Sequence, residues 1–124
     1  MKANIENGTV KSGEFRYAHT PRTLKAYGET FTIPVRTVDF EEKLNAARTS
    51  IGGALTTSDV IKEILKGIAL FIGEASTEKI FPSEKLGELD VDEVMSFWQA
   101  LNFELQRTQN EMLSRYRPAQ NIRR

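Results

Sequence analysis

The sequence predicts a mainly α-helical domain that opens with a β-hairpin, an α+β fold in which about three main helices pack in a small bundle. Apolar residues recur at steps of three and four along three long segments, which is the period of amphipathic helices. Ahead of them, residues 22–37 are rich in Thr, Tyr, Phe, Ile and Val around a short turn, which is typical of paired strands. A chain of 124 residues is the size of one domain, and we assign residues 22–115 to it.

Residues 1–21 are expected to form a partly flexible N-terminal arm, because its first part mixes glycine, asparagine and lysine without a period. The hairpin at 22–37 is expected to turn at Gly28-Glu29. Pro34 has no N–H for a strand ladder, so the second strand is expected to lie at an edge or to end near it. Since two strands alone are marginal in water, the hairpin is expected to pack against helices or against a second copy.

The first helix is predicted at 39–51. Asp39 followed by Glu42 resembles a capping box, and Gly52-Gly53 ends the periodic run. The apolar residues at helical spacing are Phe40, Leu44, Ala47 and Ile51.

The second helix is predicted at 58–73, with a cap in the preceding TTSD segment and an end at Gly73. It is apolar on most sides near its end, so more than one neighbour must enclose it. Pro82 and Gly87 indicate that residues 76–89 are a connection, with a short helical turn at 83–86.

The third helix is predicted at 91–115, opened by Asp90 with Glu93 and ended by Pro118, and a basic flexible tail at 116–124 follows it. Its apolar residues form a heptad-like stripe, which favours self-association. The stripe consists of Val91, Val94, Trp98, Leu101, Leu105, Thr108 and Met112.

Composition excludes several classes of function. The formal net charge is zero, which removes the electrostatic argument for a nucleic-acid or membrane-surface protein. The longest apolar run, 68–72, is far too short to span a bilayer, and the N-terminus has no apolar segment typical of a signal peptide. Without cysteine, no disulfide or thiolate metal site is possible. A soluble, cytoplasmic protein is expected.

Charge is unevenly distributed along the chain. Residues 38–93 carry twelve acidic residues against six lysines and arginines, whereas the last ten residues contain four arginines. A basic tail on an acidic middle favours head-to-tail self-association or contact with an acidic partner. The alternative is an ordinary solvated terminus.

No residue pattern predicts a catalytic, cofactor or metal site, so the chain is not expected to be an enzyme. The single histidine, His19, lies in the polar segment RYAHTPR with no second ligand at metal spacing. The acidic clusters Glu41-Glu42 and 90–93 stand at predicted helix starts, where the helix dipole stabilises negative charge.

Apolar surface beyond one stripe is the remaining functional signal. Aromatic residues often anchor protein interfaces, and Phe71, Phe97 and Phe103 lie off the main stripes of their helices. Such a second apolar face is either a partner surface or part of the core, and the pattern alone allows both. The predicted partner-binding residues are Phe71, Ile72, Phe97, Trp98, Leu101, Phe103 and Leu105.

Three blocks in order resemble the tail assembly chaperones of long-tailed bacteriophages and of Gram-positive prophages. They are LKAYGETFTIPVRTVDFEEKLN, DVIKEILKGIALFIGEAS and FPSEKLGELDVDEVMSFWQALNFELQRTQNEM, and the last is the most similar. The resemblance implies a helper that binds the tape measure protein, keeps it soluble and recruits tail tube subunits around it. It implies a protein of the bacterial host's cytoplasm that is absent from the mature virion.

Two other classes of protein stay open at this stage. A structural head-tail connector or tail completion protein would share a small fold of helices and a hairpin. A small nucleic-acid-binding regulator would use the arginines of the tail. Whichever class applies, the chain is expected to form a homo-oligomer, because the edge strand and the heptad-like stripe both favour self-association.

Overall fold

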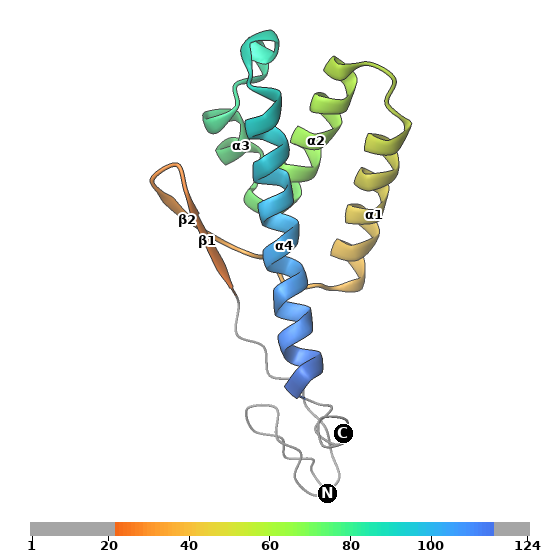
Figure 1. Ribbon diagram of the computed structural model, residues 1–124, viewed down its shortest axis with the longest axis vertical. Coiled ribbons are helices and arrows are strands. Elements are labelled where there is room, and N and C mark those ends of the chain that lie inside the picture. Colours follow the sequence, from red (N-terminus) through yellow and green to blue (C-terminus); the bar gives the residue numbers. More distant parts are fainter. Residues whose placement is uncertain (1–21, 116–124) are drawn as a thin grey trace, which may run out of the picture.

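The structure confirms the expected fold class, a mainly α domain with an N-terminal antiparallel hairpin (Figure 1). The computed structural model describes residues 22–115, and side chains as far as residue 107. The predicted arm at 1–21 and tail at 116–124 lie outside this range. In chain order the elements are β1 (Thr23–Ala26), β2 (Glu29–Thr32), α1 (Val38–Gly53), α2 (Thr57–Ile72), α3 (Glu74–Ile80), the 3₁₀ helix η1 (Ser83–Glu88) and α4 (Val91–Arg115).

Threonine and aspartate side chains cap the starts of the three long helices. At α1 the cap is Thr37, whose Oγ1 accepts from the N–H of Phe40 at 3.0 Å, so the assignment of Asp39 as the cap was wrong by two residues. At α2, Thr56 accepts from the N–H of Asp59 at 3.1 Å. The predicted cap of α4 is confirmed, because Oδ1 of Asp90 accepts from two N–H groups of the first turn.

The hairpin turns one residue earlier than predicted. Ala26 pairs with Glu29, so the two loop residues are Tyr27 and Gly28, with φ of 54° and 76°. Positive φ at both positions is the geometry of a type I′ turn, whose twist matches that of paired strands. Because β2 ends at Thr32, two residues before Pro34, the expectation for that proline is confirmed.

Helix α3 was missed in the segment interpreted as a connection. Gly73 has φ of 93° and stops α2, and the chain begins a new helix at the next residue. The hydroxyl of Thr77 is buried and donates to the carbonyl of Gly73 at 2.8 Å, which holds the first turn of α3 to this glycine. The predicted helical turn at 83–86 lies within η1.

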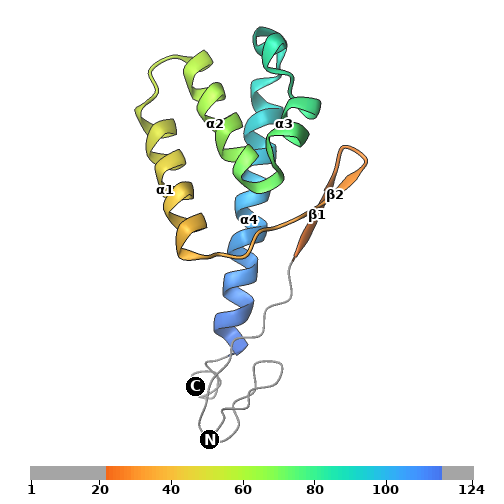
Figure 2. The ribbon, with the colours of Figure 1, turned by 180° about the vertical axis from the view of Figure 1, so that it is seen from behind.

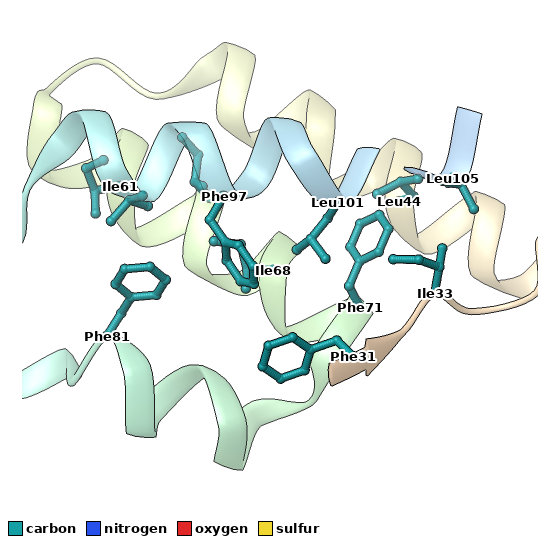
Figure 3. Close-up of a cluster of buried hydrophobic side chains, with 12 residues drawn as sticks. Phe31, Ile33, Leu44, Ile61, Ile68, Phe71, Phe81, Phe97, Leu101 and Leu105 are labelled. Carbon is teal, nitrogen blue, oxygen red and sulfur yellow. The ribbon is translucent and has the colours of Figure 1, made fainter. Parts of the chain in front are cut away.

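The core lies between α2 and α4, with α1 beside α2 and the hairpin beside α4 (Figures 1 and 2). Leu44, Ile64, Ile68, Val94 and Leu101 are completely enclosed. Figure 3 shows buried side chains from the connection after β2, from α1, α2 and α4, and from the segment after α3, converging on one cluster. The whole buried cluster consists of Phe31, Ile33, Leu44, Ile61, Ile64, Ile68, Phe71, Phe81, Val94, Phe97, Leu101 and Leu105.

The hairpin packs against helices, as expected for an isolated pair of strands. Its inner face carries Leu24 and Phe31, which are directly paired across the strands. Polar contacts fix its outer parts: Lys79 of α3 binds Glu29 at 2.8 Å, and Arg22 lies 3.6 Å from Glu104 of α4. The hairpin therefore covers one flank of α4.

Candidate functional site: a groove between α2 and α3

The seven predicted partner-binding residues do not form one exposed surface. Four of them belong to the core, with exposed fractions of 5% or less: Phe71, Phe97, Leu101 and Leu105. Ile72 and Trp98 are half-buried and pack against that core. Only Phe103 stands out, at 60% exposure. The structure therefore places these four residues in the core of the fold and not on one exposed surface with Phe103.

Aromatic packing explains why Phe97 is internal. Its ring meets Tyr27, Phe31 and Phe81 at centroid distances of 5.4, 6.0 and 6.1 Å. The first two contacts come from the hairpin, which buries the second apolar flank of α4. Edge-to-face contacts between aromatic rings are favourable, so Phe97 stabilises the core of the fold and does not form part of an exposed surface.

Phe71 on α2 is internal for a similar reason. It makes edge-on contacts with Phe40 of α1 at 5.4 Å and with Trp98 of α4 at 5.9 Å. Three helices thus meet around one ring. The prediction that α2 needs more than one neighbour near its end is confirmed by these contacts.

A groove of about 550 Å³ runs between α2, α3 and η1. Its floor is apolar, formed by half-buried Leu65, Ala69, Leu70 and Leu86 over the buried ring of Phe81. Figure 2 shows α3 beside the C-terminal part of α2, and the groove lies along this pair. A volume of this size suits one or a few apolar side chains of a ligand or partner.

Charged side chains stand on both rims of the groove. Lys62, Glu63 and Lys66 line it from α2, whereas Glu74 and Glu78 line it from α3. Three of the five have partners: Lys66 Nζ lies 3.4 Å from Glu63, and Glu78 accepts from both N and Oγ of Ser83. The side chains of Lys62 and Glu74, in contrast, make no ion pair or hydrogen bond within the described part of the chain.

An apolar trough between an α2 rim of net positive charge and an acidic α3 rim is suited to binding an amphipathic segment. Apolar side chains of the segment would fill the floor, and its flanking charges would meet rims of opposite sign.

Residues 22–115 contain no group of three or more His, Cys, Asp or Glu side chains that could hold a metal ion. The same residues contain no helix that is both long and apolar enough to cross a bilayer.

Sequence reasoning missed this groove because it missed α3, which forms one wall. The signal available was the breadth of the apolar face of α2, where Leu65, Ala69 and Leu70 extend beyond the stripe that faces α4. The single histidine, His19, lies outside the described residues.

Comparisons of the chain with models of known protein families, with curated proteins and with solved structures find no match.

Proposed function

We propose that this chain is a tail assembly chaperone of a bacteriophage or prophage, which binds helical segments of the tape measure protein in the α2–α3 groove. The groove, with its apolar floor and its two oppositely charged rims, is the observation that carries the proposal. The three sequence blocks that resemble this family support the choice of partner. In this role the protein acts in the host cytoplasm, recruits tail tube subunits and stays out of the mature virion.

The physical requirement of the partner fits the groove. A tape measure protein of the kind implied by the resemblance is a long helical rod whose apolar seams aggregate in water unless they are covered. A helix-in-groove contact covers such a seam by taking residues at i, i+3, i+4 and i+7. The floor residues Leu65 and Ala69 lie one helical turn apart on α2, with Leu70 next to Ala69, so the floor can accept side chains from successive turns of a partner helix.

Co-expression with the tape measure protein of the same phage or prophage tests the proposal. The wild-type chain is expected to keep the tape measure protein in the soluble fraction and to co-purify with it. Leu70→Glu places a carboxylate in the floor and is expected to release the partner into the pellet. Leu55→Glu is the matched control, because Leu55 is 94% exposed on the α1–α2 connection and does not line the groove.

Both variants must first show wild-type circular dichroism and a cooperative melt. A folded Leu70→Glu variant that still solubilises the tape measure protein refutes the groove as the binding site. Failure of the wild-type chain to solubilise it refutes the chaperone function. Detection of the chain by mass spectrometry of purified virions would instead favour a structural component such as a connector.

A further inference from the structure

One face of α4 is covered by no other described element. Helical spacing places it opposite Val94 and Leu101, which are completely buried. Figure 1 shows α4 in front of the other helices, with its last turns extending past α1 and the hairpin. The exposed residues of this outer face are Asp92, Met95, Ser96, Gln99, Phe103, Gln106 and Arg107.

Two large apolar side chains interrupt this polar face. Met95 is 37% exposed and Phe103 is 60% exposed, and both lie one helical turn from Gln99, on opposite sides of it. With a rise of about 1.5 Å per residue, each stands roughly 6 Å from Gln99 along the axis. Phenylalanine is one of the residue types enriched at protein interfaces, and Phe103 is mostly exposed.

Two charged residues of this face, Asp92 and Arg107, also lie on opposite sides of Gln99, further from it than Met95 and Phe103. Asp92 precedes Gln99 by seven residues and Arg107 follows it by eight, so both lie roughly 10–12 Å from it along the axis. If a second copy of α4 packs antiparallel with its Gln99 opposite the first, Met95 of each copy lies near Phe103 of the other. Asp92 of each copy likewise lies near Arg107 of the other. A parallel copy would set like charge against like charge. The face is complementary to itself in one orientation only.

We infer that a second copy of this chain covers the outer face of α4, by antiparallel pairing of the two α4 helices about a two-fold axis at Gln99. An isologous contact of this kind closes after two subunits and buries the exposed Phe103 of each. This interface goes beyond the proposed function and does not depend on it.

The side chain of Arg107 lies beside Phe103 and has only a weak ion-pair partner among the described residues of its own chain. Its guanidinium lies over the Phe103 ring, 5.9 Å from the centroid, and 3.6 Å from the carboxylate of Glu104. The Arg107–Glu104 pair is partly exposed and spans i,i+3, an arrangement that contributes little stability. Arg107 can therefore add Asp92 of a second copy without losing a strong partner.

The dimer leaves the α2–α3 groove free. Groove residues Lys62, Lys66 and Ala69 lie on the face of α2 opposite Ile64 and Ile68, which pack toward α4. Pairing through the outer face of α4 thus produces a particle with two grooves, which suits a protein that covers a long repetitive partner.

Sedimentation equilibrium of the full chain from about 1 to 200 µM tests the inference. The wild type is expected to fit a monomer–dimer equilibrium, and Phe103→Glu is expected to weaken the dimer at least about tenfold. Leu55→Glu, also exposed and apolar in the wild type, is the matched control and is expected to leave the dimer unchanged. A wild type that stays monomeric throughout, or a Phe103→Glu dimer as tight as the wild type, overturns the inference.

A charge exchange then tests the orientation. Asp92→Arg and Arg107→Asp alone each set like charges together and are expected to weaken the dimer, whereas the double variant restores opposite pairs. Recovery of the dimer in the double variant, with wild-type circular dichroism in all three, supports the antiparallel pairing. A double variant weaker than either single variant overturns it, as does a wild type that assembles beyond the dimer.

Discussion

The backbone of Gly67 on α2 lies directly against the indole ring of Trp98 on α4. A Cβ placed on Gly67 would fall 2.6 Å from Cζ3 and 2.7 Å from Cη2 of that ring. Trp98 is further held by Phe71, 5.9 Å away, and its carbonyl accepts from the side chain of Asn102 at 2.8 Å. Trp98 therefore sets the spacing of α2 and α4, a structural role that differs from the partner anchor predicted for it.

Gly67→Ala is expected to destabilise the fold. Alanine favours an α-helix by about 1 kcal/mol over glycine, but here its methyl group meets the aromatic ring. Overpacking of this kind costs about 1–3 kcal/mol, so we expect a net loss of stability and a lower Tm in thermal unfolding.

Gly52→Ala is the matched control for that substitution. A Cβ on Gly52 of α1 has no neighbour within 4 Å, so this variant is expected to be as stable as the wild type or more stable. Trp98→Phe removes the ring atoms that cause the clash, so it is expected to reduce the cost of Gly67→Ala in a double-mutant cycle. Equal Tm changes for the two glycine variants would show that Gly67 is not under steric constraint.

Phe97 and Phe103 are expected to differ sharply in their effect on stability. Phe97→Ala empties a buried aromatic site and is expected to cost about 3–5 kcal/mol, measured by urea unfolding. Phe103→Ala changes an exposed residue and is expected to shift the free energy of unfolding by only about 0.5 kcal/mol at concentrations where the chain is monomeric. Similar costs for both would mean that Phe103 is also internal.

The sequence could not decide between these two phenylalanines, because the deciding contact is tertiary. Both lie off the heptad-like stripe, and only the position of the hairpin makes one of them core. The stripe itself was predictable where it is described: Val94, Leu101 and Leu105 are buried by their spacing alone. Its first residue, Val91, is 38% exposed, because α4 begins there and fewer neighbours surround it.

The candidate groove was not predictable because of one glycine. Gly73 ended α2 as expected, but its positive φ also lets α3 begin at once and turn back along α2. The turn of the hairpin was missed by one residue because Tyr27 adopts a left-handed conformation that its residue type rarely takes. Its ring contacts with Phe81 and Phe97 compensate for that local cost.

Gly28→Ala is expected to destabilise the hairpin. Gly28 has φ of 76°, a region where a Cβ costs roughly 1–2 kcal/mol, although the space around it is open. Gly87→Ala is the control, since that site is equally open and its φ lies outside the left-handed range. A lower Tm for Gly28→Ala alone, in thermal unfolding, supports the type I′ turn, and equal Tm values contradict it.

The hydrogen bond between Tyr27 and Glu93 is expected to make stability depend on pH in the alkaline range. The hydroxyl of Tyr27 donates to Oε2 of Glu93 at 2.8 Å. Burial of the phenol, and then its bond to the Glu93 carboxylate and the charge of that group, raise the pKa of Tyr27 well above its usual value. Because the folded pKa is the higher one, this contribution is complete below pH of about 10 and is lost as the pH rises further.

Tyr27→Phe isolates this effect, since other tyrosines and lysines of the chain titrate in the same range. Urea unfolding of both proteins from pH 8 to about 11.5 should show the wild type more stable at the lower end and the difference narrowing as the pH rises above about 10. The difference should be modest, because the Tyr27 side chain is 44% exposed and solvent screens the interaction. Parallel profiles over the whole range would mean that the phenol loses its proton as easily in the folded chain as in the unfolded one, and that the Tyr27–Glu93 hydrogen bond does not help to hold the hairpin to α4.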